Sequence, residues 1–371
     1  MRFVFVQNFP NQLQSASLRA LAEQPDVDVT LAVEGGIPEW RQRIGWRPPE
    51  FGRASVQTTT CSEICRLVDS ATSDDVFVFS GTRASKSVRV GLPRAMRSPA
   101  LVGIMAEPGI GIGLKGSIRR LNARLEGFRI ASKVNFVLSI GHLGHDWYRL
   151  AGYPSCKLFP YGYFVEGASV VPTKTRGKVR RLIFIGQLVR RKGVDLLLEA
   201  LSGLRDLDFE LVIVGDGVSR GHYENLSTKL GLSRAVKFIG SAPNREALQT
   251  LAEMDVLVLP SRWDGWGAVV NEALMRGVRV VCSSKCGAAD LIRSPSHGAV
   301  FQSGSILALR TVLRRIMADE PRPDLAREAL SSWARCLEGE YAARYLLDVV
   351  DSVRRQQPGP TPPWMAPWPA A

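Results

Sequence analysis

The chain has 371 residues, enough for two domains that each bury a core, with 45% hydrophobic and 22% charged residues. This composition excludes a wholly disordered, collagenous or coiled-coil protein, and no stretch reaches the roughly 18 apolar residues of a membrane-spanning helix. The net charge of +13 indicates anionic partners, which are nucleic acid, an acidic membrane surface or phosphorylated substrates.

Localisation and thiol chemistry follow from two further features. The opening residues, MRFVFVQNFPNQ, contain too short an apolar run for a signal peptide. The six cysteines form no CxxC pair, and the CxxxC spacings of Cys61/Cys65 and Cys282/Cys286 are accompanied by only four His. We therefore expect reduced thiols, no metal site and a cytoplasmic protein.

The first half of the chain alternates short apolar or β-branched runs with amphipathic stretches. This alternation is typical of parallel strands joined by helices. The expected strands are Arg2–Val6, Asp28–Val33, Val76–Ser80, Ala100–Met105 and Asn135–Ile140. The expected helices between them are Gln14–Glu23, Ser62–Ala71, Ser117–Ala131 and Leu143–Ala151.

A polar, basic segment, PTKTRGKVRR at 172–181, interrupts this pattern and is typical of a linker. The alternation then restarts. The expected strands are Leu182–Ile185, Glu210–Val214, Val236–Ile239, Val256–Leu259 and Val278–Cys282. The expected helices are Val194–Leu204, Tyr223–Leu230, Arg245–Glu253, Val269–Arg276, Ala288–Arg293, Ser305–Ala318, Leu325–Arg335 and Tyr341–Arg354.

The pattern predicts an α/β protein with two doubly wound Rossmann-like domains facing a central cleft. We assign an N-terminal domain to residues 1–171, a linker to 172–181 and a second domain to 182–336. A C-terminal helix at 337–356 either stays with the second domain or returns to the first. The Pro-rich tail, 357–371, is expected to be disordered.

Three segments of the second half carry candidate chemistry. In RLIFIGQLVRRKGVDLLLEAL, a strand ends at Gly186, and Lys192 stands where the next helix begins, which suits a phosphate. In ELVIVGDGVSR, Gly215 and Gly217 flank a turn at a strand end, where small residues allow close approach of a ligand. Taken alone, each segment is equally compatible with an ordinary solvated loop.

The third segment, DVLVLPSRWDGWGAVVNEALMRGVRVVCSSKCG, is the most informative. A strand ends at Pro260, and a turn containing Asp264 then opens a helix whose first amides are free to bind an anion. Glu272 lies about one turn inside that helix. Two carboxylates flanking an anion site suit a ligand with a central diphosphate and hydroxyl groups on both sides, such as a nucleotide sugar.

These segments, in this order over residues 181–292, resemble the donor-binding domain of the family 4 retaining glycosyltransferases, which have the GT-B fold of two Rossmann-like domains. The matching elements are the Lys-Gly-Val-Asp helix start, the Gly-Asp-Gly turn and Pro-Ser…Asp-Gly-Trp-Gly…Asn-Glu-Ala. The N-terminal half matches only in its rhythm of strands and helices.

The resemblance implies a role for each matching position. Lys192 would contact the donor diphosphate, Glu272 the nucleotide ribose and Asp264 the hydroxyls of the transferred sugar. The full set of implied donor-binding residues is Gln187, Lys192, Gly215, Gly240, Ser241, Gly265, Trp266, Gly267, Ala268, Val269 and Glu272. Asp264 and Glu107 are the candidate catalytic residues.

The sequence departs from the family pattern at three places. Asp264 replaces the usual Glu and is one methylene shorter, and Gln187 stands where an Arg is frequent. A Gly-Gly loop near the first strand is replaced by Asn8-Phe9-Pro10-Asn11. Arg190 or Arg191 is a candidate substitute for the missing phosphate cation.

The acceptor side is expected in the first half. Glu107 follows a strand, and a glycine-rich loop at 108–116 then leads into a basic helix that includes Lys115, Arg119 and Arg120. These three residues are the candidate acceptor-binding cations. The same helix has an apolar stripe of Ile118, Leu121, Leu125 and Phe128, which either faces the core or contacts an anionic membrane.

We therefore expect a metal-independent retaining hexosyltransferase that uses a nucleotide diphosphate sugar, with a UDP-sugar favoured, and needs no cofactor. The expected acceptor is a saccharide or a polyprenyl-linked saccharide in cell-surface polysaccharide synthesis, at the inner face of the membrane. An inactive partner subunit is the alternative, because of Gln187. A nucleic-acid-binding protein is the remote alternative, and the sequence lacks aromatic-flanked basic motifs for it.

Overall fold

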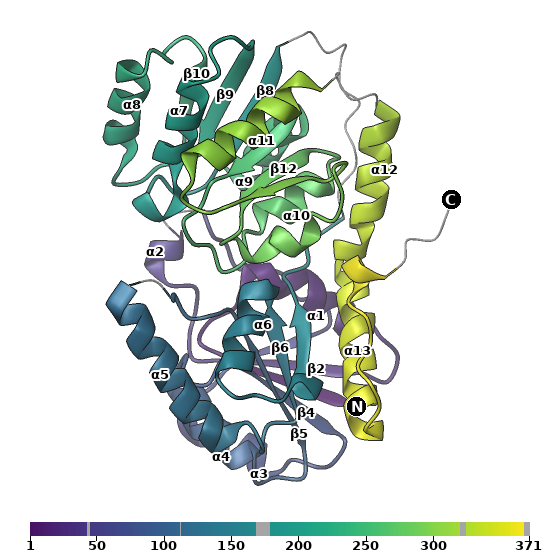
Figure 1. Ribbon diagram of the computed structural model, residues 1–371. Helices are drawn as coiled ribbons and strands as arrows, with labels where there is room; N and C mark the ends of the chain where they lie inside the picture. Colours follow the sequence, from purple (N-terminus) through teal and green to yellow (C-terminus); the bar gives the residue numbers. More distant parts are fainter. Residues whose placement is uncertain (43–44, 112, 168–178, 320–323, 367–371) are drawn as a thin grey trace. The chain divides into compact units, whose positions relative to one another are not determined.

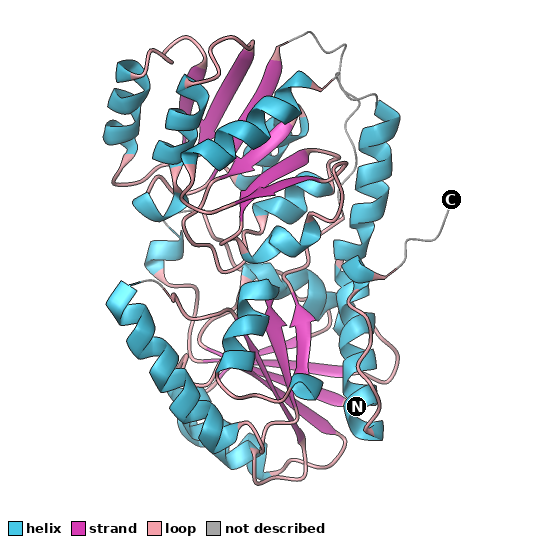
Figure 2. Cartoon of the chain, viewed as in Figure 1, coloured by secondary structure: helices cyan, strands magenta, loops and turns pink. Residues whose placement is uncertain are grey.

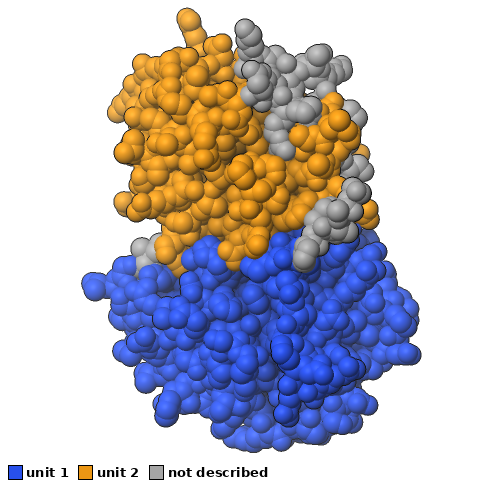
Figure 3. Space-filling view, turned by 45° about the vertical axis from the view of Figure 1, so that its right-hand side comes forward, with its two compact units in different colours: residues 1–166, 336–371 blue, residues 167–335 orange. Residues whose placement is uncertain are grey.

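The computed structural model describes residues 1–42, 45–111, 113–167, 179–319 and 324–366. It divides into a first unit, residues 1–166 with 336–371, and a second unit, residues 167–335 (Figures 1 and 3). The expected linker falls mostly outside the described residues. Its last two positions are Arg180 and Arg181, and they open a strand instead, because Arg180 is buried and its Nε donates to the carbonyl of Met317.

The first unit contains a parallel sheet of seven strands in the order β3-β2-β1-β4-β5-β6-β7 (Figure 2). Its strands are β1 (Arg2–Gln7), β2 (Asp28–Val33), β3 (Ser55–Thr58), β4 (Asp75–Ser80), β5 (Leu101–Ala106), β6 (Phe136–Ile140) and β7 (Leu158–Tyr161). Its helices are α1 (Ser15–Ala22), α2 (Glu39–Gln42), α3 (Cys61–Asp69), α4 (Lys86–Ala95), α5 (Gly113–Ile130), α6 (Gly141–Leu150) and α13 (Gly339–Arg355).

The two faces of this sheet are covered by different helices. Val4 and Val6 pack with Ile64 of α3 and Val88 of α4, whereas Phe5 points to the opposite face, toward α1 and α13. This alternation is the period-2 pattern of a strand that is buried on both faces.

The second unit contains a parallel sheet of six strands in the order β10-β9-β8-β11-β12-β13. Its strands are β8 (Arg180–Ile185), β9 (Phe209–Val214), β10 (Val236–Gly240), β11 (Val256–Leu259), β12 (Arg279–Ser283) and β13 (Gly298–Phe301). Its helices are α7 (Val194–Ser202), α8 (Arg220–Lys229), α9 (Asn244–Ala252), α10 (Val269–Leu274), α11 (Ile306–Ala318) and α12 (Asp324–Ala334). Residues 287–291, expected as an α-helix, form a short 3₁₀ turn.

The C-terminal segment belongs to the first unit. Helix α13 packs against α1, although the two are more than 300 residues apart in sequence. The expectation of a disordered tail is wrong for residues 357–366, because Trp364 is buried and its ring lies 6.1 Å from that of Phe164. Residues 367–371 lie outside the described residues.

Besides the short helix α2, four elements were not anticipated from the sequence. Strand β3 is an exposed edge strand, β7 contains Pro160, and α4 contains Pro93. Strand β3 lacks the apolar pattern of a buried strand, and proline is unfavourable inside a strand or a helix. The local sequence therefore predicts these three elements only weakly. Strand β13 has only four residues and begins at a glycine.

Candidate active site

The candidate donor site lies at the carboxyl ends of β8 and β11 in the second unit. These strands are neighbours at the centre of the sheet, and the strand order runs outward from them in both directions. Such a switch point is where doubly wound sheets bind ligands, because the loops leave to opposite sides. The loop after β8 carries Lys192, and the loop after β11 carries Asp264.

The two loops are held together backbone to backbone. Gly193 has a φ of +71°, and a Cβ on it would lie 2.2 Å from the carbonyl oxygen of Pro260. The amide of Arg262 donates to the carbonyl of Arg191 at 2.8 Å. Only glycine satisfies both the left-handed backbone and this approach, so the glycine after Lys192 fixes the position of the lysine.

Lys192 and Asp264 form the central ion pair of the site. Their Nζ and Oδ2 atoms are 2.5 Å apart, and the side chains are only 14% and 11% exposed. The same carboxylate oxygen lies 3.5 Å from the Ser261 hydroxyl, and an Arg191 guanidinium nitrogen lies 4.0 Å from the other. Asp264 therefore reaches the lysine despite its shorter side chain, and two cations stand beside it.

The segment around Asp264 is pinned to the loop after β12. The Asp264 amide donates to the carbonyl of Lys285 at 2.8 Å, and the Gly287 amide donates to the carbonyl of Asp264 at 3.0 Å. The side chain of Trp266 is buried, and its indole N–H donates to Asn271 at 2.9 Å. The indole is therefore anchored in the core, and a role of Trp266 in donor binding stays a prediction.

The start of α10 offers backbone donors beside this pair. Among the described residues, the amides of Gly267, Ala268 and Val269 have no hydrogen-bond acceptor. Gly267 has a φ of +93°, and a Cβ there would lie 2.8 Å from the sulfur of Cys286. Gly265 lies in the same turn, and its carbonyl closely approaches Gly287.

Glu272 lies in α10 and is half-buried. Burial raises the pKa of its carboxyl group, and the nearby Arg276 guanidinium only partly opposes this. Arg276 also donates to the Glu272 carbonyl oxygen at 2.9 Å. The ionised carboxylate is therefore less stable in this position than in water. Groups with such perturbed pKa values are typical of functional sites.

The Gly-Asp-Gly turn packs against the loop after β8. A Cβ on Gly215 would lie 2.0 Å from the carbonyl oxygen of Gly186, and Leu188 donates its amide to the carbonyl of Asp216 at 2.8 Å. The sequence suggested that these glycines allow the close approach of a ligand. In the structure, the backbone of Gly186 approaches Gly215 instead. Gln187 lies within this loop and is partly exposed.

Sequence reasoning missed Arg220 at this edge. Its guanidinium pairs with Asp216 at 3.1 Å and Glu224 at 2.8 Å, and one nitrogen lies 3.2 Å from the Cβ position of Gly240. Ser241 follows as an exposed residue. The sequence signal for these ion pairs was that the three charged residues are spaced four apart.

The first unit brings Glu107 into a cluster at the carboxyl edge of its own sheet. The buried Tyr163 hydroxyl hydrogen-bonds the Glu107 carboxylate, and a side-chain hydrogen bond also joins Tyr163 to Asn11. Burial raises the pKa of Tyr163 well above its usual value, with Glu107 acting in the same direction. Tyr163 was not anticipated, because it follows β7 and lies far from Glu107 in sequence.

Arg41 completes this cluster. Burial lowers the pKa of Arg41, while Tyr163 and Glu107 are close enough to oppose that effect. Its guanidinium lies 4.1 Å from the ring centroid of Trp46 and 5.2 Å from that of Phe9. A cation between two rings and beside a carboxylate is fixed in position.

The candidate acceptor cations lie on α5, and two of them bind the glycine-rich loop. Arg119 donates to the carbonyl of Ile110 at 3.2 Å, and Arg120 donates to that of Gly111 at 2.7 Å. Lys115 is exposed. The two arginines therefore fix the loop before α5, although each keeps further N–H groups.

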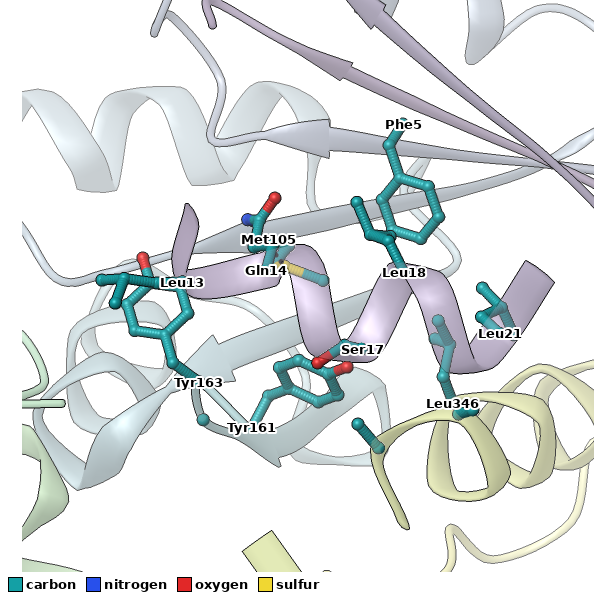
Figure 4. A pocket seen from close by; sticks show the side chains of 13 residues that line it. Phe5, Leu13, Gln14, Ser17, Leu18, Leu21, Met105, Tyr161, Tyr163 and Leu346 are labelled. Carbon is teal, nitrogen blue, oxygen red and sulfur yellow. Dashed lines mark hydrogen bonds between the residues drawn. The ribbon is translucent and has the colours of Figure 1, made fainter. Parts of the chain in front are cut away.

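A small apolar cavity lies in the first unit between α1 and α13 (Figure 4). It is lined by side chains such as Phe5, Leu18 and Leu346, and the Gln14 amide nitrogen there lies 3.3 Å from the sulfur of Met105. The space accommodates about one water molecule, so it is not a substrate site.

Two negative findings concern the described residues alone. No three His, Cys, Asp or Glu side chains gather there in a way that could hold a metal ion. None of the described helices combines the length and apolar character needed to cross a membrane.

Comparisons with known proteins agree with the fold of two parallel units. Residues 170–333 match the family model described as glycosyl transferases group 1. The chain is 29% identical over 145 residues to the 2-deoxystreptamine glucosyltransferase of Streptomyces kanamyceticus, covering 38% of this chain and 37% of that one. The chain thus spans well under half the length of this curated relative.

Solved structures show a similar fold over nearly the whole chain. The Anabaena protein HepE in complex with UDP has a TM-score of 0.72 at 14% identity, covering 95% of this chain and 100% of that one. The lipopolysaccharide outer core galactosyltransferase WaaB, in its apo form, has a TM-score of 0.71 at 13% identity, covering 95% and 99%.

Two doubly wound parallel units of this kind define the GT-B fold of glycosyltransferases. The match covers residues 170–333, so the second unit is similar to the group 1 glycosyl transferases.

Proposed function

We propose that this protein transfers a hexose from a nucleoside diphosphate sugar, with UDP as the favoured nucleotide, to a saccharide or lipid-linked acceptor. The observation that carries the proposal is the Lys192–Asp264 pair beside free amides at the β8/β11 switch point. Support for UDP comes from the fold neighbour HepE, which was solved with UDP.

Each group at the donor edge has an assigned task in this proposal. Lys192 and the amides of Gly267 to Val269 neutralise the diphosphate, Glu272 binds the ribose hydroxyls, and Asp264 faces the sugar hydroxyls. Gly240 and Ser241 lie beside the base. Positioned cations and amides stabilise charge that develops on a leaving group, and this is often the largest contribution to catalysis.

The proposed reaction retains the configuration of the sugar and uses no metal. The acceptor hydroxyl oxygen forms a bond to the anomeric carbon on the face from which the diphosphate departs. The bond between that carbon and the phosphate oxygen breaks, and the acceptor proton passes to the departing phosphate. Glu107 in the first unit would position the acceptor, held by Tyr163 and beside Arg41.

The inactive-subunit alternative rests on Gln187, which leaves one phosphate cation missing. The structure offers a replacement, because an Arg191 nitrogen lies 4.0 Å from Asp264 and donates to the carbonyl of Trp263 at 2.8 Å. We therefore favour an active enzyme.

We place the reaction in cell-surface polysaccharide synthesis at the inner face of the membrane. Residues 83–133 contain eleven Lys and Arg against Glu107 and Glu126, a net charge of +9. Such a segment is attracted to anionic lipid. The fold neighbour WaaB is a lipopolysaccharide galactosyltransferase, and this supports the same class of acceptor.

The test is a thermal-shift screen against UDP-, GDP- and dTDP-sugars, followed by NMR of the product anomer. A donor at 100 times its Kd stabilises the fold by about 2.7 kcal/mol. We expect one nucleotide class to shift the unfolding midpoint, retention at the anomeric carbon, and full activity in EDTA. No shift with any donor would overturn the proposal, and activity restored only by Mn²⁺ or Mg²⁺ would overturn its metal-free mechanism.

A further inference from the structure

Helix α5 packs on the first unit through its smallest side chains. A Cβ on Gly127 would lie 1.9 Å from the carbonyl oxygen of Ala151, and one on Gly116 would lie 2.3 Å from the carbonyl carbon of Gly111. Gly116, Ala123 and Gly127 are seven and four residues apart, which places them on one face of the helix. This face is the inner face of α5. Among the large apolar residues of α5, Ile130 at its C-terminal end also packs against the core.

The other large apolar residues of α5 are exposed. Between 55% and 92% of each side chain is exposed in this outer stripe, which consists of Leu114, Ile118, Leu121, Leu125 and Phe128. Of the two alternatives for this stripe, the core-facing one is thus excluded. An exposed apolar stripe along most of an 18-residue helix marks an interaction surface.

A groove of about 260 Å³ lies between α5 and α6, next to the outer stripe. Apolar atoms of Leu121, Leu150 and Trp147 line it together with Arg120 and Arg124. No Asp or Glu lines this groove, so its two positive charges are not neutralised locally. A basic groove with apolar walls suits a ligand that has an anionic head and a hydrocarbon body.

The protein orders both guanidinium groups at the groove. Nε of Arg124 donates to the carbonyl of Leu150 at 3.0 Å, and Arg120 donates to Gly111 and to the Ser117 hydroxyl, the latter at 3.2 Å. A guanidinium has five N–H donors, so most of them remain for a ligand. Ordered arginines with spare donors match phosphate oxygens.

We propose that the α5–α6 groove binds the phosphate group of an anionic membrane phospholipid, while the outer stripe of α5 enters the lipid interface. The inference rests on the membrane location in the proposed function, and it adds a defined lipid site to a general charge attraction. Trp147 fits this placement, because indole rings are enriched at the membrane interface.

The experiment is co-sedimentation with vesicles of phosphatidylcholine alone or with 30 mol% phosphatidylglycerol, at matched ionic strength. We expect the parent to bind only the anionic vesicles. Arg120→Gln/Arg124→Gln should reduce that binding about 30-fold, since each basic residue near the surface contributes about 1 kcal/mol. The matched control, Arg234→Gln/Arg315→Gln, removes the same charge from exposed positions of the second unit.

A smaller loss of vesicle binding in the control than in the groove variant supports a lipid site in the groove. Equal losses of vesicle binding in the two variants would overturn that site. Leu125→Ser/Phe128→Ser should also lose binding, whereas Leu307→Ser/Leu325→Ser, at exposed positions of α11 and α12, should not. Retained binding by the α5 stripe variant would overturn insertion. Displacement by 10 mM glycerol 3-phosphate at constant ionic strength would overturn the lipid in favour of a soluble phosphate.

Calorimetry with UDP separates this inference from the proposed function. Every variant should bind UDP as the parent does, because the substitutions lie outside the donor edge. A parent that binds vesicles but no nucleotide overturns the proposed function alone. A parent that binds UDP but no anionic vesicles overturns this inference alone.

Discussion

The two units share parallel, doubly wound sheets but position their candidate residues by different means. In the second unit, backbone atoms of neighbouring loops touch at glycines, such as Gly193 against Pro260 and Gly215 against Gly186. In the first unit, side chains hold the edge together, with Arg41 against Trp46 and Tyr163 bonded to Glu107. The comparison shows that a similar sheet edge can be fixed by backbone fit or by side-chain contacts.

This difference has consequences for mutation. A backbone contact of this closeness admits only glycine, so the second unit should respond sharply to single changes. A side-chain contact loses one interaction when it is truncated and leaves the loops in place. The predictions below run from the largest expected effect to the smallest.

Lys192→Ala should have the largest effect. It removes the cation nearest the expected diphosphate and leaves the largely buried Asp264 carboxylate with only the more distant Arg191 guanidinium, at 4.0 Å. We expect transfer to fall by ~100-fold or more, as for loss of a transition-state donor. Removal of one partner also destabilises the fold. Initial rates at saturating donor and urea unfolding measure the two effects.

The matching change in the first unit is Arg119→Ala, which removes an exposed cation that donates to the carbonyl of Ile110. It should cost much less than Lys192→Ala in both measurements. Equal losses from the two variants would contradict the assignment of the diphosphate to the second unit.

Gly193→Ala should destabilise the second unit strongly, because its Cβ would meet the Pro260 carbonyl oxygen at 2.2 Å. Gly304→Ala is the control, since Gly304 has a similar φ of +82° and nothing lies within 4 Å of its Cβ position. The control should cost only the backbone strain of ~1–3 kcal/mol. Chemical denaturation of both variants measures the excess, and equal costs would show that the loop contact is dispensable.

Glu272→Gln should weaken donor binding yet stabilise the fold. A carboxylate hydrogen bond contributes ~1.5–3 kcal/mol, so UDP affinity should fall by at least about tenfold. Burial raises the pKa of Glu272 above its unfolded value, so the folded state binds more protons and the ionised group costs stability at neutral pH. Glutamine removes that cost.

Calorimetry with UDP and thermal unfolding at pH 7.5 test this trade-off. The stability gain over the parent should shrink as the pH falls from the raised folded pKa of Glu272 toward its unfolded pKa, and it should vanish below the unfolded pKa, where both states are protonated. Unchanged affinity with an intact fold would remove Glu272 from the donor site.

Tyr163→Phe should have the smallest effect. It removes the hydroxyl that holds Glu107, at a cost of ~1 kcal/mol in stability. We expect the acceptor KM to rise a few-fold while UDP affinity stays constant. Steady-state kinetics with varied acceptor measure this, and a change in UDP affinity instead would place Tyr163 outside the acceptor side.

The sequence by itself determined most of the fold. Apolar strands and the restart after residue 181 gave two parallel α/β units, because strands buried on both faces must be apolar throughout. It also predicted the candidate donor edge, since motifs such as the Gly-Asp-Gly turn are contiguous and their spacing is local. Lys192, Asp264 and Glu272 were all predicted in this way, and their roles stay predictions.

Only the tertiary structure decided which side chains face solvent and which distant residues meet. Trp266 is part of the motif, yet its ring is buried, and Phe128 continues an apolar stripe, yet it is 92% exposed. Tyr163 and Glu107 meet only because β5 and β7 end at the same sheet edge. Periodicity predicts that a helix has an apolar face, but packing decides which face is buried, and on α5 the glycines take that place.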